Sequence, residues 1–190
     1  MNLGQMMLAS LSLVLLGIIA LGANTTMLET SEIRSDSEFS TTAVGLATSV
    51  VEEAMAKVYD EAAADSTLGF VADPKVFALS TSLGPDAGES YRASKAGSKD
   101  FNDFDDFDGL RISFRSASDP DTAHTPGTTN VVVPGLRTRY LLTATVDYVN
   151  ENNLDVAIGA RAWIKKITVT VTSPNMERPV TLPAIMCYWN

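Results

Sequence analysis

The feature that most constrains this chain is a run of eighteen uncharged residues near its start, from Met6 to Ala23. As an α-helix, this run would be about 27 Å long, which is just enough to cross the hydrocarbon core of a bilayer. Such a segment has no reason to face water in a folded monomer. We therefore expect it to lie in a membrane or among other apolar helices.

Three interpretations of this segment compete: a cleaved signal peptide, a permanent membrane anchor, and a helix that leaves the membrane to become the core of a filament. The small residues of Ala20-Leu-Gly22 fit a cleavage signature. No Lys or Arg occurs before Arg34, however, so the basic region that begins a secretory signal is missing. The sequence favours retention of the segment.

A second helical pattern, amphipathic this time, follows between Ser37 and Ala64. Apolar residues recur there at spacings of three and four, and most of the charged residues fall between them. The apolar positions are Phe39, Ala43, Leu46, Ala47, Val50, Val51, Ala54 and Val58. The stretch from Asn24 to Ser37 is rich in Ser and Thr, so it either continues the helix or melts locally.

Four strand-like runs occupy the second half of the chain: 110–115, 140–149, 163–172 and 179–188. In the third run, Ile167, Val169 and Val171 alternate with threonines, which predicts one buried face and one exposed face. Pro183 cannot donate a ladder hydrogen bond, which predicts that the last run is an edge strand. The turn formers of Ser173–Pro179 predict a hairpin between the third and fourth runs.

These patterns predict an α+β fold, in which a long helix, first hydrophobic and then amphipathic, packs on an antiparallel sheet of about four strands. With 190 residues, the chain has room for one compact domain and an anchor. We expect residues 1–36 to form the hydrophobic helix with its polar continuation. Residues 37–190 would form the globular head.

An acidic aromatic segment, Asp100–Gly109, precedes the first predicted strand. Its phenylalanines, Phe101, Phe104 and Phe107, recur every three residues, which would place them on one face of a tight turn and leave the carboxylates on the other. A structural turn or a solvated acidic loop explains this period. The functional alternative is a calcium site, although an EF-hand register would put Phe104 at the first ligand position. The candidate calcium ligands are Asp105, Asp106 and Asp108.

The composition argues against several classes of function. The formal net charge is −9, so the basic surface that binds nucleic acid is not expected. Cys187 is the only cysteine, which excludes an intrachain disulfide, and His124, the only histidine, lies among turn formers as an expected solvated loop residue. The sequence contains no Gly-rich phosphate loop, paired-histidine motif or nucleophile elbow, so we do not expect an enzyme.

The layout resembles type IV pilins and pilin-like minor subunits: an uncharged first helix, an amphipathic continuation, irregular loops and an antiparallel sheet. Two stretches resemble minor pilins of the mannose-sensitive haemagglutinin type. They are Phe104-Asp-Asp-Phe-Asp-Gly109 before a strand, and Lys165-Lys-Ile-Thr-Val-Thr-Val-Thr172 followed by Arg178-Pro-Val-Thr-Leu182. The likeness covers most of the chain.

The resemblance implies a structural subunit that begins in the inner membrane and is added by a pilus assembly machinery to a homo-oligomeric helical filament at the cell surface, with a role in cell adhesion. It implies processing between Gly4 and Gln5, although the leader Met1–Gly4 is uncharged and Ala9 stands where pilins usually carry a glutamate. Neither a cofactor nor nucleic acid is implied. The residues expected to pack in the filament core are Met7, Ala9, Ser10, Leu11, Leu13, Val14, Leu15, Gly17, Ile18, Ile19 and Leu21.

Two other functions fit the same sequence pattern. A membrane-anchored binding module in the periplasm or at the cell surface would share the anchor and the sheet but remain monomeric. A minor pseudopilin of a secretion system would cap or prime a filament instead of forming its bulk.

Overall fold

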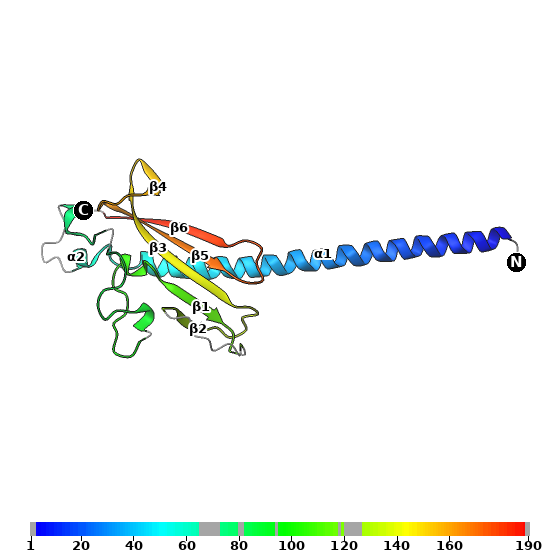
Figure 1. Ribbon diagram of the computed structural model, residues 1–190, viewed down its shortest axis with the longest axis horizontal. Helices are drawn as coiled ribbons and strands as arrows, with labels where there is room; N and C mark the ends of the chain where they lie inside the picture. The colour runs from blue at the N-terminus through cyan, green and yellow to red at the C-terminus, as the bar shows by residue number, and fades with distance from the viewer. Residues whose placement is uncertain are drawn as a thin grey trace. The chain divides into compact units, whose positions relative to one another are not determined.

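A computed structural model describes residues 3–64, 73–79, 82–93, 95–117, 119 and 127–188. His124 lies outside these residues, so its expected exposure stays a prediction. The chain divides into two compact units, Met1–Phe39 and Ser40–Asn190. The fold is α+β, with one long helix and a six-stranded, mostly antiparallel sheet (Figure 1).

Helix α1 runs from Leu3 to Met55, and its residues up to Phe39 belong to the first unit. The polar stretch after Asn24 continues the helix instead of melting. The hydroxyls of Thr25 and Thr26 donate to the backbone carbonyl of Gly22 at 2.9 and 3.0 Å, and the Thr30 hydroxyl donates to the backbone carbonyl of Thr26 at 2.7 Å. Because these hydroxyls bond to the preceding turn, they are satisfied without breaking the helix.

The last turns of α1, from Ser40 onward, cross one face of the sheet in the second unit (Figure 1). They bury four small or medium residues completely: Ala43, Ala47, Val50 and Ala54. The spacing of three and four puts these residues on a single stripe, as the sequence predicts. Because three of the four are alanines, the helix backbone can lie close to the sheet.

The sheet has the strand order β2-β1-β3-β5-β6, and β4 pairs with one end of β3. Strands β1 and β2 are parallel and every other pair is antiparallel. The strands are β1 (Arg111–Arg115), β2 (Thr129–Val132), β3 (Tyr140–Asn150), β4 (Asn153–Ala157), β5 (Ile164–Thr172) and β6 (Val180–Cys187).

One face of the central strands forms the core. Strand β5 buries Ile167, Val169 and Val171, each fully inaccessible, while its threonines face outward. Its register opposite β3 pairs Ile167 with Val146 and Val169 with Ala144. The inward face of β3 consists of Tyr140, Leu142, Ala144, Val146 and Tyr148. The predicted alternation is confirmed in both strands.

The C-terminal hairpin also follows the prediction. Strand β6 pairs with β5 alone and lies at an edge of the sheet, with Pro183 opposite Thr168. An edge strand needs ladder hydrogen bonds on one side only, so a residue without an N–H is tolerated there.

Three features differ from the sequence-based expectation. The sheet has two more strands than predicted, β2 and β4, and one parallel pair. Helix α1 ends at Met55, and a separate turn of helix, α2 (Glu61–Ala64), follows after a break. In that break Val58 forms a parallel bridge with Asp103, so tertiary pairing overrides the helical pattern that continues to Val58.

Candidate functional site

The predicted filament-core residues all lie on α1 in the first unit, and the structure exposes every one of them. The large apolar side chains from Leu3 to Leu21 are 58–79% exposed, so the described part of the chain offers them no packing partner. By length and composition α1 is also the one described helix that could cross a membrane. The described residues therefore leave this apolar surface uncovered, and its length and composition fit insertion into a membrane.

The serine hydroxyls of this segment are already satisfied within the helix. Ser10 Oγ donates to the carbonyl of Met7 and Ser12 Oγ to that of Ala9, each at 2.9 Å. The segment thus presents apolar surface and small residues, without a hydroxyl that requires a partner. Gly4 and Gln5 lie in the first turn of the same helix and are exposed. Their processing stays a prediction.

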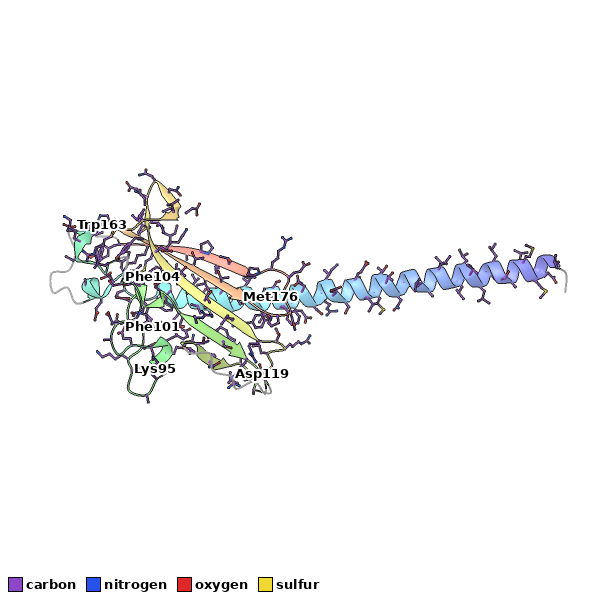
Figure 2. All side chains as sticks on the ribbon, viewed as in Figure 1. Lys95, Phe101, Phe104, Asp119, Trp163 and Met176 are labelled. Carbon is purple, nitrogen blue, oxygen red and sulfur yellow. The ribbon has the colours of Figure 1, made fainter. Side chains whose placement is uncertain are left out.

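The acidic aromatic segment is a tight turn, as one interpretation predicts, and its 3₁₀ helix η3 spans Asp105–Phe107. Phe101 and Phe104 lie in the segment that leads into β1 (Figure 2), and both are buried together with Phe107. The phenyl ring of Phe107 contacts those of Phe101 and Tyr91 edge-on, with centroids 5.3 and 6.2 Å apart.

Three of the five carboxylates in this segment are buried, although the sequence predicts that they face solvent. Asp103, Asp105 and Asp106 are 1–4% exposed. Buried carboxylates require hydrogen bonds or ion pairs. Two backbone N–H groups, of Asn102 and Asp103, donate to Asp106 Oδ2 at 2.8 and 3.1 Å, and the N–H of Asp106 donates to Asp103 Oδ1 at 3.1 Å. The turn is closed by its own aspartates.

Lys165 supplies the one buried cation among the described residues, and its side chain is fully inaccessible. Its Nζ donates to Asp105 Oδ1 at 2.6 Å, to the Tyr59 carbonyl at 2.8 Å and to Asp60 Oδ2 at 2.9 Å. An ammonium group has three N–H donors, and all three are used. Asp60 is held in turn by the N–H groups of Ala62 and Ala78, at 3.1 and 3.0 Å.

A short parallel pairing explains why two carboxylates meet at this amine. Val58 bridges Asp103, and the N–H of Phe104 donates to the Val58 carbonyl at 2.9 Å. Asp60 and Asp105 each lie two residues beyond the bridged pair, on neighbouring parallel segments. Their side chains are therefore brought to the same place, where strand β5 presents Lys165.

Aromatic rings enclose the amine. Lys165 Nζ lies 4.5 Å from the ring centroid of Tyr59 and 5.3 Å from that of Tyr148. The hydroxyl of Tyr59 donates to the Ala162 carbonyl and that of Tyr148 to the Ala78 carbonyl, at 2.7 and 2.9 Å. Burial raises the pKa of both phenols, so they remain neutral donors. The rings favour a cation and exclude water.

Burial also changes the acidity of the carboxyls. Desolvation, with repulsion from Asp105 and Asp106, raises the pKa of Asp103 to about 8. Desolvation likewise raises the pKa of Asp105, against the opposing attraction of Lys165, and Asp103 and Asp105 share a hydrogen bond. Asp103 therefore carries a proton at neutral pH and is the donor in that bond.

The three candidate calcium ligands are placed differently by the structure. Asp105 bonds Lys165, Asp106 caps its own turn, and Asp108 Oδ1 accepts the N–H of Val146 at 2.8 Å. Within the described residues, no group of three or more acidic, His or Cys side chains is arranged to hold a metal. The calcium hypothesis stays a prediction.

Sequence-based reasoning did not single out Lys165, Tyr59 or Asp60. A signal for Lys165 was present: it precedes Ile167 by two residues and so falls on the inward face of an alternating strand. A charged residue at an inward position of a central strand requires a buried partner. No comparable local signal marks Tyr59 and Asp60, because the helical pattern continues up to them.

The comparisons with known proteins add no relative. No protein-family model matches this chain, and no curated protein or solved structure matches it either. The likeness to pilins rests on the chain layout and on short motifs. At the level of the structure, it comprises a long N-terminal apolar helix whose later turns pack on a sheet.

Proposed function

We propose that this protein is a structural subunit of an extracellular filament of the type IV pilus kind. Its copies would polymerise through the apolar part of α1, and the second unit would form the filament surface. The subunit would wait in the inner membrane until an assembly machinery adds it to the polymer. Its role would be structural and not catalytic.

The observation that carries this proposal is the exposure of the apolar helix. Nineteen consecutive residues of α1, Leu3 to Leu21, carry no charge, and their large side chains are all exposed. Lipid covers such a surface before assembly, and neighbouring copies of the same helix cover it afterwards. The small residues Ala9, Ser10 and Gly17 would allow those helices to approach closely.

The charged part of α1 also fits a polymer. The first charge is Glu29, and Arg34 forms an exposed ion pair with Glu38, with Nε and Oε1 3.8 Å apart. The apolar and charged segments are thus separated along one helix. A bundle of such helices would bury the first segment and leave the second at its wetter margin.

A monomeric membrane-anchored binding module would use the same helix, and it is the main alternative. The filament subunit and the monomeric module differ in how strongly the shape of each apolar side chain affects stability. Lipid is as apolar as leucine, so trimming a leucine there matters little, whereas a void between packed helices is repeated in every subunit.

Replacing Leu13 with Ala tests this difference. We expect Leu13→Ala to stay in the membrane fraction but to reduce the polymer that shear releases from cells several-fold, because each subunit loses packed methylene groups. The matched control is Leu79→Ala, a half-exposed leucine of the second unit, which should leave polymer yield unchanged. Equal polymer yields from both variants would contradict packing through α1.

A further inference from the structure

The buried amine of Lys165 and the carboxyl group of Asp105 are placed closely enough to react with each other, as well as to form an ion pair. Lys165 Nζ and Asp105 Oδ1 lie 2.6 Å apart, and both side chains are at most 6% exposed. They belong to segments 60 residues apart, η3 and β5. Holding two reacting groups in contact replaces a bimolecular encounter with an intramolecular step, worth an effective concentration of about 10⁵ M or more when well oriented.

We propose that Lys165 and Asp105 become joined by an intramolecular amide bond, so that the mature protein carries a covalent cross-link between η3 and β5. The step is a condensation. The nitrogen Nζ forms a bond to the carboxyl carbon Cγ, one carboxyl oxygen leaves as water, and no oxidant or other reactant is needed. An ammonium and a carboxylate become an amide and a water molecule, without net loss or gain of protons.

The surroundings supply the protonation states that the step requires. Attack needs a neutral amine and a protonated carboxyl group. Proton transfer from the Lys165 ammonium group to a carboxylate in contact with it would supply both neutral groups. Asp103 holds a proton and shares a hydrogen bond with Asp105, so it can deliver that proton to the departing oxygen.

Asp60 completes the site on the other side of the amine. Its Oδ2 lies 2.9 Å from Lys165 Nζ and can accept the proton that the ammonium gives up. The N–H groups of Ala62 and Ala78 hold this carboxylate in place. After condensation, Nζ keeps one hydrogen, and this amide N–H is positioned to donate a hydrogen bond to Asp60 Oδ2.

Asp105 is a better reactant than Asp60 for two reasons. It lies nearer the amine, at 2.6 against 2.9 Å, and it is the carboxyl that Asp103 contacts. A cavity of about 490 Å³ borders Asp60, Asp103 and Asp105 and offers the released water a way out.

The bond would remove a costly feature of the fold. A buried ammonium and carboxylate lose their hydration, and their mutual attraction repays that loss only in part. An amide carries no charge, and it ties the turn that holds the phenylalanines to a central strand. The cross-link would then withstand heat and pulling forces that separate an ion pair.

Intact mass spectrometry of the full-length chain, purified in detergent, tests the proposal. We expect the wild-type mass to be lower than the sequence mass by one water molecule, and proteolysis to yield a branched peptide that contains Lys165 and Asp105. Lys165→Arg keeps a buried cation but lacks a nucleophilic amine, and Asp105→Ala lacks the carboxyl group, so both should show the full sequence mass. Lys166→Arg, on the opposite face of β5, should keep the deficit.

The variant Asp103→Asn tests whether the reaction needs a proton donor in addition to the contact between Lys165 and Asp105. This variant keeps both reacting groups and the shape of the protonated side chain but cannot transfer a proton, so unreacted chain should accumulate. A deficit as complete as in the wild type would contradict the role of Asp103.

One other reaction of this chain also loses water, namely succinimide formation at Asp108-Gly109. Mild alkali hydrolyses a succinimide but leaves the Lys165 amide intact, and the branched peptide locates the bond directly. A folded wild-type chain with the full sequence mass and a free Lys165 amine would overturn the proposal.

Discussion

The side chain of Lys165 carries a positive charge into a region from which water is excluded. Four buried carboxyls surround or adjoin it, those of Asp60, Asp103, Asp105 and Asp106. At this scale the second unit contains matched buried polar groups in addition to its apolar core. Each group depends on the others, because a buried charge that loses its partner keeps the cost of its burial.

Removing the Lys165 amine should therefore destabilise the second unit strongly. Measured against wild-type chain that has not formed the Lys165–Asp105 amide, we expect Lys165→Met to lower the free energy of unfolding of the second unit by about 3–5 kcal/mol, because Asp60 and Asp105 lose the cation between them. Unfolding followed by near-ultraviolet circular dichroism measures this loss. Lys166→Met is the control: its Nζ lies 3.7 Å from the exposed Asp155, so it should cost about 1 kcal/mol or less. Equal losses for the two variants would contradict the buried network.

The acidity of Asp103 predicts a pH dependence. Its pKa is about 8 in the folded chain against an ordinary value of 3.8, so between these values the folded state binds the extra proton. Stability contributed by this group therefore falls as pH rises from about 4 to about 8. The melting temperature of the wild type should therefore fall relative to that of Asp103→Asn, which mimics the protonated form and does not titrate, as pH rises across this window. A constant difference in melting temperature from pH 4 to pH 8 would show that Asp103 ionises normally.

At the scale of secondary-structure elements, periodic segments could be predicted and segments shaped by tertiary pairing could not. The alternation of β5 and the spacing of Ala43, Ala47, Val50 and Ala54 carry their own burial pattern. Strand β4 has every residue exposed, so no alternation marks it. Strand β2 has four residues and pairs in parallel with β1. This pairing is a tertiary contact between separate segments, so the local sequence of β2 does not predict it.

The end of α1 follows the same rule. Its helical pattern runs on to Val58, but the structure ends the helix at Met55 and uses the next residues to bridge Asp103 and to reach Lys165. The candidate site could likewise be predicted only where its residues follow a periodic pattern. Lys165 lies on the same inward face of β5 as the core residues, whereas Tyr59 and Asp60 reach the site only through the break in the helix.

Cutting the chain before Ser37 tests the independence of the second unit. Residues 37–190 keep the amphipathic turns that bury Ala43 to Ala54, together with the whole sheet. We expect this fragment to be soluble, monomeric and cooperatively folded, because the exposed apolar side chains before Leu28 are gone while the core stays complete. A fragment that aggregates or lacks a cooperative thermal transition would show that the first unit is needed for folding.

At the scale of the whole molecule, one chain combines an exposed apolar helix with a unit that has a complete core. The large apolar side chains of α1 from Leu3 to Leu21 meet no partner in the described chain, whereas the inward residues of β3 and β5 are fully packed. The two units therefore have different needs: the first requires an apolar environment, and the second tolerates water. A polymer with α1 at its centre would meet both needs.

Shearing of wild-type cells, followed by electron microscopy with an antibody against residues 40–190, tests polymerisation most directly. We expect filaments in the membrane-free fraction that bind the antibody along their length and contain this chain as the main protein. Retention of all the protein in the membrane, with no labelled filament released by shear, would contradict polymerisation and leave the monomeric anchored module in its place.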